Sequence, residues 1–367
     1  MSGATGSGAV ILRPLIIADQ LRRSVPGGIG TYIRGLVAGL RELGMEPSLY
    51  AGKKRASAEA DSLQELGLTV FSSALLGPLM TRLWDVGVGR LPGDFDLVHA
   101  ASLALPPRGN RPLTAMVHDL AWRHFPEAYP VRGRKWHEAA LARASSRCDA
   151  LFTPSEKGRA DLLDAGVEAH RVHVVIEGCD HLPEPDHEGA RLVLKRAGVE
   201  GSYLLTVGTL EPRKNFSTLF SAYEAASRAL PERWPLVVVG PSGWGVEAPA
   251  PENVIALGPL SPKIIAGLYA NCRAFVSVPL LEGWGLPVAE AMAMGAPVVS
   301  SDVPSAGGAT LIVDPLDADA IAHAVVQVAT DEAIRADLIA RGKERAAELT
   351  WAKAAYQHIE VWERLGG

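Results

Sequence analysis

The sequence predicts an α/β protein with two domains, each built on a parallel β-sheet. Short apolar runs alternate with helical segments along the chain, a pattern typical of βαβ units. The runs are rich in Val, Ile and Leu without polar alternation, as expected for strands buried on both faces. A segment rich in Pro, acidic residues and His, 177–189, separates two series of such runs. The length of 367 residues also fits two domains of roughly 150 residues or more.

Each expected element follows from a local pattern. The first series of predicted strands covers 11–19, 96–100, 113–119, 150–155 and 173–178, and the second covers 203–208, 235–240, 253–258, 274–279 and 297–302. Helices are predicted at 31–43, 135–144, 215–228 and 317–330, and the tail 351–365 has an amphipathic helical pattern. We therefore expect two doubly wound, Rossmann-like parallel-sheet domains, 1–182 and 190–350, that face each other across a cleft.

Composition excludes several classes of function. With 36 Lys and Arg against 41 Asp and Glu, the formal net charge is -5, which gives no electrostatic footprint for nucleic acid. The cysteines Cys148, Cys179 and Cys272 lie far apart, which argues against a disulfide scaffold or a zinc site. The first residues lack a signal-peptide pattern, and no apolar run approaches the ~18 residues that span a bilayer. A reduced, cytoplasmic protein is the simplest interpretation.

The most informative segment is 279–302, PLLEGWGLPVAEAMAMGAPVVSSD. After a predicted strand come Glu282 and a glycine-interrupted loop, and Pro287 then opens a helix. The free N–H groups and positive dipole end of such a helix suit a phosphate. Glu282 and Glu290 lie before and inside the helix, so they would accept hydrogen bonds from different hydroxyls of one sugar or ribose ligand. The structural alternative is a solvated helix face beside a tight turn.

Two cations follow the first strand of the second series. This strand ends at Gly208, a loop carries Arg213 and Lys214, and a helix is predicted from Asn215. Arg as a fork and Lys as a point charge suit a diphosphate. The carboxyl ends of strands are also where α/β folds bind ligands. The alternative is a solvated surface pair.

A glycine-rich segment, VPGGIGTYIRGL (25–36), follows the first strand. Gly27, Gly28 and Gly30 would let the backbone approach a bound group before a helix that starts near Thr31. The segment does not complete a nicotinamide-binding fingerprint, and the chain has no GxxxxGK[ST] phosphate loop. By itself it indicates only a close approach of the backbone to a ligand.

His118 ends another strand of the first series, beside Asp119. It could form a hydrogen bond with a substrate hydroxyl, and a purely structural histidine is the alternative. Asp94 and Asp96 fit a D-x-D metal pattern, but they immediately precede a strand, where acidic residues mark the turn. The histidines of segment 177–189 lack the helical spacing of metal ligands. No metal site is therefore expected.

Four segments in this order, PGGIGTY, VHDL, GTLEPRKN and EGWGLPVAEAMAMGAPVVSSD, resemble the motifs of retaining glycosyltransferases of family 4. The resemblance is strong from Tyr203 to about Pro315 and limited to two short motifs in the first half. PRKN is most similar to the bacterial mannosyl- and rhamnosyltransferase branch, whose products belong to cell-envelope polysaccharide. The family implies nucleotide-sugar donors and the GT-B fold, in which a C-terminal helix, here 351–367, crosses back to the first domain.

The resemblance implies how the donor diphosphate is bound. Arg213 and Lys214 would hold it, supported by backbone N–H groups of Gly28 and of Gly285 to Leu286. In this fold cations and helix dipoles stabilise the leaving diphosphate, so no metal and no cofactor is expected. Retention is generally explained by front-face attack, with the leaving phosphate accepting the proton of the acceptor.

The resemblance also implies how the sugar is bound. Glu282 would bind hydroxyls of the transferred sugar, Glu290 the ribose, and His118 the sugar from the N-terminal side. The predicted catalytic residues are Glu282, His118, Lys214 and Arg213. The predicted donor-binding residues are Gly28, Thr209, Arg213, Lys214, Glu282, Gly283, Trp284, Gly285, Leu286 and Glu290.

The chain departs from the family pattern at three places. Thr209 stands where many members have Arg, and Arg213 would replace its charge. Segment 301–315 is shorter than usual, which would affect donor affinity or specificity. Ile176-Glu177-Gly178 replaces the usual Pro-Asn-Gly before the linker.

The expected activity is transfer of a hexosyl group, mannose-like, from a nucleoside diphosphate sugar to a glycan or lipid-linked acceptor. GDP-mannose is the first expectation for the donor, and UDP- or dTDP-sugars are the alternatives. A GT-B epimerase or phosphorylase, or a non-catalytic nucleotide-sugar binder, are the other functions considered. The epimerase would form an isomerised nucleotide sugar instead of a glycoside.

Two segments of the first half suggest where a lipid-linked acceptor could be met. Residues 71–84 are apolar with little charge, and 132–136, RGRKW, are locally basic. Together they could contact an anionic membrane surface. The protein would then be cytoplasmic and peripheral at the inner membrane face. The alternative is a core helix and a solvated basic turn.

Overall fold

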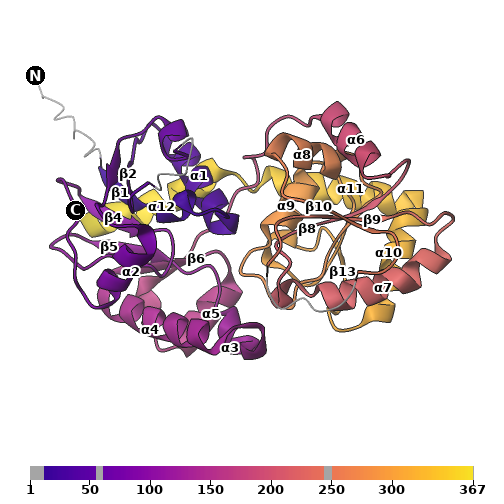
Figure 1. Ribbon diagram of the computed structural model, residues 1–367. Coiled ribbons are helices and arrows are strands. Elements are labelled where there is room, and N and C mark those ends of the chain that lie inside the picture. The colour runs from indigo at the N-terminus through magenta and orange to yellow at the C-terminus, as the bar shows by residue number, and fades with distance from the viewer. Residues whose placement is uncertain (1–11, 55–60, 244–249, 367) are drawn as a thin grey trace, which may run out of the picture.

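The computed structural model describes residues 12–54, 61–243 and 250–366, which form two α/β lobes (Figure 1). Residues 1–11 of the first predicted domain, which include the start of the predicted strand 11–19, lie outside the described residues, as does Gly367. One lobe contains a seven-stranded sheet and the other a six-stranded sheet. Every strand pair within both sheets is parallel. The predicted fold class is confirmed.

The sheet of the first lobe has the strand order β3-β2-β1-β4-β5-β6-β7. Its strands are β1 (Pro14–Ile17), β2 (Ser48–Ala51), β3 (Val70–Ser72), β4 (Leu97–Ala100), β5 (Leu113–Met116), β6 (Ala150–Thr153) and β7 (Val172–Val174). Each predicted strand of the first series is present. Strands β2 and β3 were not predicted, because β2 begins with Ser48, β3 ends with Ser72 and β3 is not fully buried, so neither has the continuous apolar pattern of the central strands.

The sheet of the second lobe has the order β10-β9-β8-β11-β12-β13. Its strands are β8 (Leu204–Val207), β9 (Leu236–Val239), β10 (Val254–Gly258), β11 (Ala274–Ser277), β12 (Val298–Ser300) and β13 (Leu311–Ile312). Again each predicted strand is present. The unpredicted strand β13 has only two residues and lies at the sheet edge.

Helices connect the strands in both lobes. In the first lobe these are α1 (Gly27–Glu42), α2 (Gly77–Asp85), α3 (Ala121–His124), α4 (Val131–Arg147) and α5 (Glu156–Asp164). In the second they are α6 (His187–Arg196), α7 (Phe216–Ala229), α8 (Pro262–Asn271), α9 (Leu286–Ala293), α10 (Ala318–Thr330) and α11 (Glu332–Ala347), and α12 (Trp351–Gly366) ends the chain.

Three helix starts differ from the sequence prediction. Helix α4 begins at Val131 rather than at 135, so the basic residues of 132–136 lie in its first turns. Helix α1 begins at Gly27 rather than near Thr31, so the glycines form its first turn instead of a preceding loop. Pro26 has a helical φ of -65° just before this turn, where N–H groups need no partner within the helix. Helix α6 begins at His187, inside the predicted linker, because the Asp186 side chain accepts a hydrogen bond from the N–H of Gly189 and caps it.

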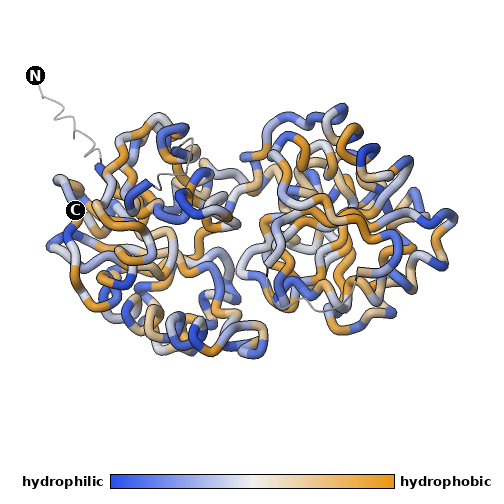
Figure 2. Tube along the Cα trace, in the orientation of Figure 1, coloured by the Kyte–Doolittle hydropathy of each residue, from blue (hydrophilic) through white to orange (hydrophobic). Residues whose placement is uncertain are grey.

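Both faces of each sheet are buried, as doubly wound domains require. The neighbouring residues Leu15 and Ile16 of β1 are both 0% exposed and belong to different apolar clusters. In the second lobe Val237 and Val238 of β9 divide between two clusters in the same way. Figure 2 shows hydrophobic residues concentrated in the strands inside each lobe. The strands are therefore continuously apolar because both of their faces are buried, as inferred from the sequence.

The last helix, α12, packs against the first lobe, where Figure 1 shows it among the earliest elements of the chain. Its Trp351 lies so close to α1 that a Cβ at Gly35 would be 2.0 Å from the indole, and one at Gly39 would be 2.1 Å from the Trp351 carbonyl oxygen. The buried Tyr32 hydroxyl lies 2.8 Å from Nε2 of His358 on this helix. The C-terminal segment is thus fixed to the N-terminal lobe by packing and by a buried hydrogen bond.

Candidate active site

The order of the strands determines where a site can form. In the second sheet the chain runs outward from β8 in one direction to β9 and in the other to β11. Loops that leave the carboxyl ends of such neighbouring strands diverge and make room for a ligand. The turn η5 (Pro212–Lys214) follows β8, and the loop that leads to α9 follows β11. The predicted cations and the predicted acidic loop therefore meet at this switch point.

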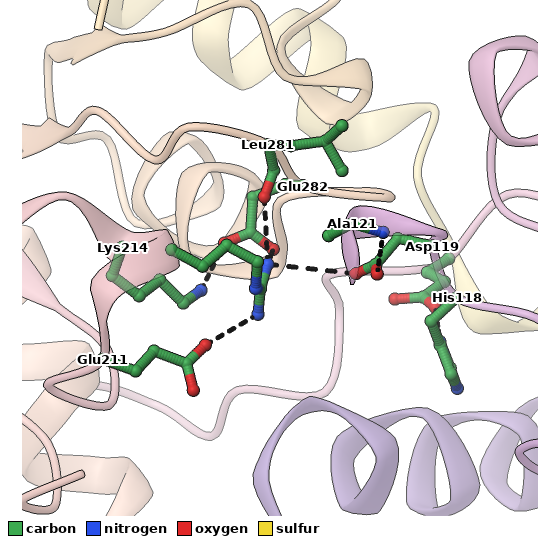
Figure 3. Close-up of polar contacts among 9 residues, drawn as sticks. His118, Asp119, Ala121, Glu211, Lys214, Leu281 and Glu282 are labelled. Carbon is green, nitrogen blue, oxygen red and sulfur yellow. Dashed lines mark hydrogen bonds and ion pairs between the residues drawn. The ribbon is translucent and has the colours of Figure 1, made fainter. Parts of the chain in front are cut away.

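Arg213, Lys214 and Glu282 form the centre of the candidate site (Figure 3). One carboxylate oxygen of Glu282 pairs with the Lys214 ammonium, and the other lies 2.9 Å from Nη1 of Arg213. Arg213 also donates hydrogen bonds to the Leu281 carbonyl at 3.0 Å and to Glu211 at 2.9 Å. The guanidinium is thereby held by several acceptors, which fixes its position.

The charges in this cluster are strongly coupled. Burial alone would raise the pKa of Glu282, but Arg213 and Lys214 outweigh it and bring the pKa to about 2. Burial disfavours the charged form of Arg213, but Glu282 and Asp119 outweigh it, and its pKa is raised well above the usual value. With Asp119 and Glu211 included, two cations face three carboxylates, a net charge of -1. A bound diphosphate would therefore have to replace Glu282 as the partner of the cations.

Asn215, which sequence reasoning treated only as the start of a helix, explains how the cationic turn is held. It adopts a left-handed conformation, with φ of 60°, between η5 and α7. Its buried amide donates to the carbonyls of Val278, at 3.0 Å, and Pro315, at 2.7 Å. Asn tolerates this conformation better than most residues. An Asn directly after two cations and before an apolar helix was the signal for this role.

The two lobes touch beside the charged cluster. Asp119 Oδ2 of the first lobe lies 3.9 Å from Nη1 of Arg213. Figure 3 shows Asp119 on the side of the cluster that faces the first lobe. Gly283 packs so closely that an added Cβ would lie 1.6 Å from the carbonyl oxygen of His118. A Cβ at Gly28 would lie 3.7 Å from Leu286 Cδ1, so the first turn of α1 also faces the start of α9. The glycine segments predicted from sequence to approach a ligand therefore line the contact between the lobes.

His118 is held by two protein acceptors. Its Nδ1 lies 3.0 Å from Oε1 of Glu177, and its Nε2 lies 3.0 Å from the Ala101 carbonyl oxygen. Burial favours the neutral ring, but Glu177 outweighs it, and the pKa of His118 is raised. In Figure 3 the ring of His118 points away from Glu282 and Lys214. Contact between this ring and a sugar stays a prediction.

Glu290, on α9, also binds protein donors. Its two carboxylate oxygens lie 3.0 Å from Nε2 of His181 and 3.1 Å from the Tyr269 hydroxyl. Trp351 at the start of α12 donates to Nδ1 of the same histidine, so Nε2 carries the proton that Glu290 accepts. His181 was predicted to lie in a linker without a role, because its partner Glu290 is more than one hundred residues away in the sequence. Binding of ribose by Glu290 stays a prediction.

The other predicted donor-binding residues lie in the same two loops. Thr209 follows β8, and Gly285, with φ of 98°, directly precedes α9, which begins with Leu286. Trp284 is 5% exposed, and its indole Nε1 has no hydrogen-bond partner among the described residues. Trp284 therefore anchors the loop in the apolar core, and the backbone N–H groups around Gly285 and Leu286 remain the groups at the helix start that can bind an anion.

Across residues 12–54, 61–243 and 250–366, no three or more His, Cys, Asp or Glu side chains are grouped so that they could hold a metal ion. Within the same part of the chain, no helix combines the length and the apolar character needed to cross a bilayer.

Comparison with known proteins agrees with this geometry. Residues 26–181 match the family described as Glycosyltransferase Family 4, and residues 201–331 match Glycosyl transferases group 1. The chain is 31% identical to the O-antigen chain mannosyltransferase B of Escherichia coli, over 73% of this chain and 74% of that protein. It is 25% identical to the phosphatidyl-myo-inositol mannosyltransferase of Mycolicibacterium smegmatis, over 94% and 92%.

A solved structure shows the same fold. The crystal structure of HepE from Anabaena, in complex with UDP and glucose, superposes with a TM-score of 0.72 at 17% identity, covering 96% of this chain and 100% of that one. At this identity the likeness concerns the fold, which is that of GT-B enzymes. With its two family matches and its mannosyltransferase relatives, the chain is a hexosyltransferase that belongs to glycosyltransferase family 4.

Proposed function

We propose that the protein transfers a mannosyl-like hexose, with retention and without a metal, from a nucleoside diphosphate sugar to a glycan or lipid-linked acceptor. The observation that carries this proposal is the buried cluster of Arg213, Lys214 and Glu282 at the switch point. Two cations there can neutralise a leaving diphosphate, and a carboxylate can accept hydrogen bonds from sugar hydroxyls.

The cluster accounts for donor binding as an exchange of partners. When the diphosphate reaches Arg213 and Lys214, Glu282 is released from both and can accept hydroxyls of the transferred sugar. The free N–H groups and the positive dipole ends at the starts of α1 and α9 favour the binding of a negatively charged group. When the diphosphate leaves, its negative charge is stabilised by cations and N–H groups that are already in place, so these groups need not reorganise during transfer.

GDP-mannose is our proposed donor, because relatives that match most of the chain at 31% and 25% identity are named as mannosyltransferases. The neighbour HepE was solved with UDP and with UDP-glucose, which supports a nucleotide-sugar donor in general. UDP- and dTDP-sugars are therefore the comparison donors.

A transfer assay tests the proposal. Purified protein is incubated with GDP-mannose, UDP-sugars and dTDP-sugars and an acceptor panel, with and without EDTA, and the anomeric configuration of each product is read by NMR. We expect an α-mannoside from GDP-α-mannose, unchanged yield in EDTA, and loss of turnover in Glu282→Ala and Lys214→Ala. An isomerised nucleotide sugar as product, donor binding without turnover, or full activity in both variants would contradict the proposal.

We further propose that a lipid-linked acceptor is met at helix α2. Its Met80 and Trp84 are buried, whereas Leu76 and Leu79 are 47% and 48% exposed. The indole of Trp136 on α4 donates to Asp85 at 2.9 Å, so the exposed basic start of α4 lies beside α2. Vesicles containing phosphatidylglycerol should carry the protein upward in a flotation assay at low salt. Failure to float with them contradicts the membrane contact.

A further inference from the structure

Glu177 has no role in the motifs described above, yet it is among the most deeply buried charged residues. It lies in the segment that connects the two lobes, where the family resemblance implies Asn, and it is 2% exposed. Its carboxylate lies 3.0 Å from Nδ1 of His118. A carboxylate removed from water at a connecting segment needs a compensating partner, and the His118 ring is that partner.

The hydrogen-bond pattern bears on the protonation state of His118. The Ala101 carbonyl can only accept, and so can Glu177 when it is ionised, so beside an ionised Glu177 both ring nitrogens carry a proton. A neutral ring has one proton and would leave one of these two acceptors without a donor. The pair is therefore a buried imidazolium held between a carboxylate and a carbonyl.

The surroundings of the ring agree with this charge. Tyr32 of α1 meets the His118 ring edge-on, with centroids 5.1 Å apart. Asp119, the next residue, adds a second negative charge that favours the protonated ring, whereas burial opposes it. The contact from the second lobe is made by Gly283, which has no side chain to titrate. Glu177 is the group that decides the balance.

The ring also determines where the contact between the lobes lies. The His118 carbonyl is the atom that Gly283 approaches, and the Asp119 side chain faces Arg213. Two hydrogen bonds fix the ring, and the ring fixes the backbone that carries both contacts. With one hydrogen bond the ring could turn, and both contacts would shift.

We propose that Glu177 is a positioning residue for sugar transfer: it holds His118 as a doubly hydrogen-bonded imidazolium and so fixes the 118–119 backbone against the Gly283 loop. This inference rests on the proposed function for its catalytic consequence only. The pair itself can be tested without any substrate.

The first test observes the histidine directly. In protein labelled with ¹⁵N-histidine, long-range ¹H–¹⁵N spectra distinguish protonated from unprotonated ring nitrogens, and the His118→Gln variant assigns the signal. We expect both nitrogens of His118 to be protonated at pH 7 in the wild type and in Glu177→Asp. Glu177→Gln should have one unprotonated nitrogen at that pH. An unprotonated His118 nitrogen in the wild type at pH 7 overturns the proposal, whatever the activity.

The second test is the pH profile of kcat/KM. Because the pKa of His118 is raised, the wild type should keep the doubly hydrogen-bonded imidazolium until the pH rises through that pKa. Glu177→Gln should lose the imidazolium at a lower pH. A shift of the basic limb by one pH unit makes the variant about tenfold slower above both values, with little difference at pH 5.5. Glu177→Asp should restore most of the wild-type profile.

Controls separate the possible failures. Glu184→Gln removes an exposed carboxylate from the same segment and should leave the profile unchanged. Thermal unfolding checks that Glu177→Gln is folded, and if it is not, Glu177→Asp and the wild-type spectrum still decide whether the pair exists. Superimposable profiles for Glu177→Gln and wild type overturn the positioning role. Absence of transfer in the wild type refutes the proposed function instead, and the spectra remain decisive for the pair.

Discussion

Replacing Gly283 by Ala should separate the two lobes without unfolding either one. The new Cβ would lie 1.6 Å from the His118 carbonyl oxygen, whereas such carbon–oxygen contacts are ordinarily about 3.3 Å or longer. The two groups must therefore move apart by roughly 1.7 Å. Gly283 is absent from the residues with positive φ, so alanine fits its backbone conformation. The effect of the substitution is thus confined to the contact between the lobes.

A shift of this size should be large for catalysis and small for stability. Misplacing reacting groups by 1 Å can reduce the rate about 100-fold, so we expect kcat/KM to fall by at least that factor. The melting temperature should change by no more than about 2 °C, because no packing within a lobe is lost. Small-angle scattering should show a larger radius of gyration. Gly109→Ala is the matched control, since a Cβ there meets nothing within 4 Å.

Retained activity in Gly283→Ala would refute a catalytic role for the contact between the lobes. If Gly283→Ala keeps kcat/KM within twofold of the wild type and has the same radius of gyration, the lobes do not need this contact for catalysis. If the melting temperature falls steeply instead, the contact stabilises the fold. The loss of activity would then result from unfolding and not from a displacement of the lobes.

Two further predictions concern stability. Tyr32→Phe leaves the buried nitrogens of His99 and His358 without their shared hydroxyl, each 2.8 Å away, so we expect a loss of about 2–5 kcal/mol in the free energy of unfolding, measured by denaturant titration; Tyr356→Phe, at an exposed site, should lose almost nothing, and equal losses would contradict the prediction. Glu282 has its pKa depressed to about 2 from an ordinary value of 4.5, so its ion pairs stabilise the fold fully above pH 4.5 and lose that effect as pH falls toward 2. The difference in melting temperature between wild type and Glu282→Gln should therefore be constant from pH 7 to 5.5 and smaller at pH 3.5; a difference that grows on acidification would be inconsistent with this sign.

Local sequence patterns predicted much of the fold. Val237 and Val238 are buried on opposite faces of one sheet, so both must be apolar, and that requirement is visible in the sequence. The edge strand β13 has only two residues, too few to form a recognisable apolar run in the sequence. The start of α1 was misplaced because three glycines are typical of loops, whereas the first turn of a helix also tolerates them.

The residues of the candidate site that lie together in short loop motifs were predictable from the sequence. Arg213, Lys214 and Glu282 occur in motifs, and the strand order brings these motifs together. Contacts made over long sequence separations left no local signal. Glu177 is 59 residues from His118, and its role depends on which acceptors surround a ring that the sequence does not place. The only signal was an acidic residue in the position where the family pattern has Asn.

The most direct test of the central claim is calorimetric titration of wild type, Lys214→Ala and Glu282→Gln with GDP and UDP. If the diphosphate takes Lys214 from Glu282, Lys214→Ala should weaken binding of the preferred nucleotide by about 10-fold or more, the size of a charge-assisted hydrogen bond. Glu282→Gln should bind that nucleotide at least as tightly as the wild type, because a competing carboxylate is gone, while losing sugar transfer. Unchanged affinity in Lys214→Ala, or weaker nucleotide binding in Glu282→Gln, would contradict the exchange of partners on which the proposed function depends.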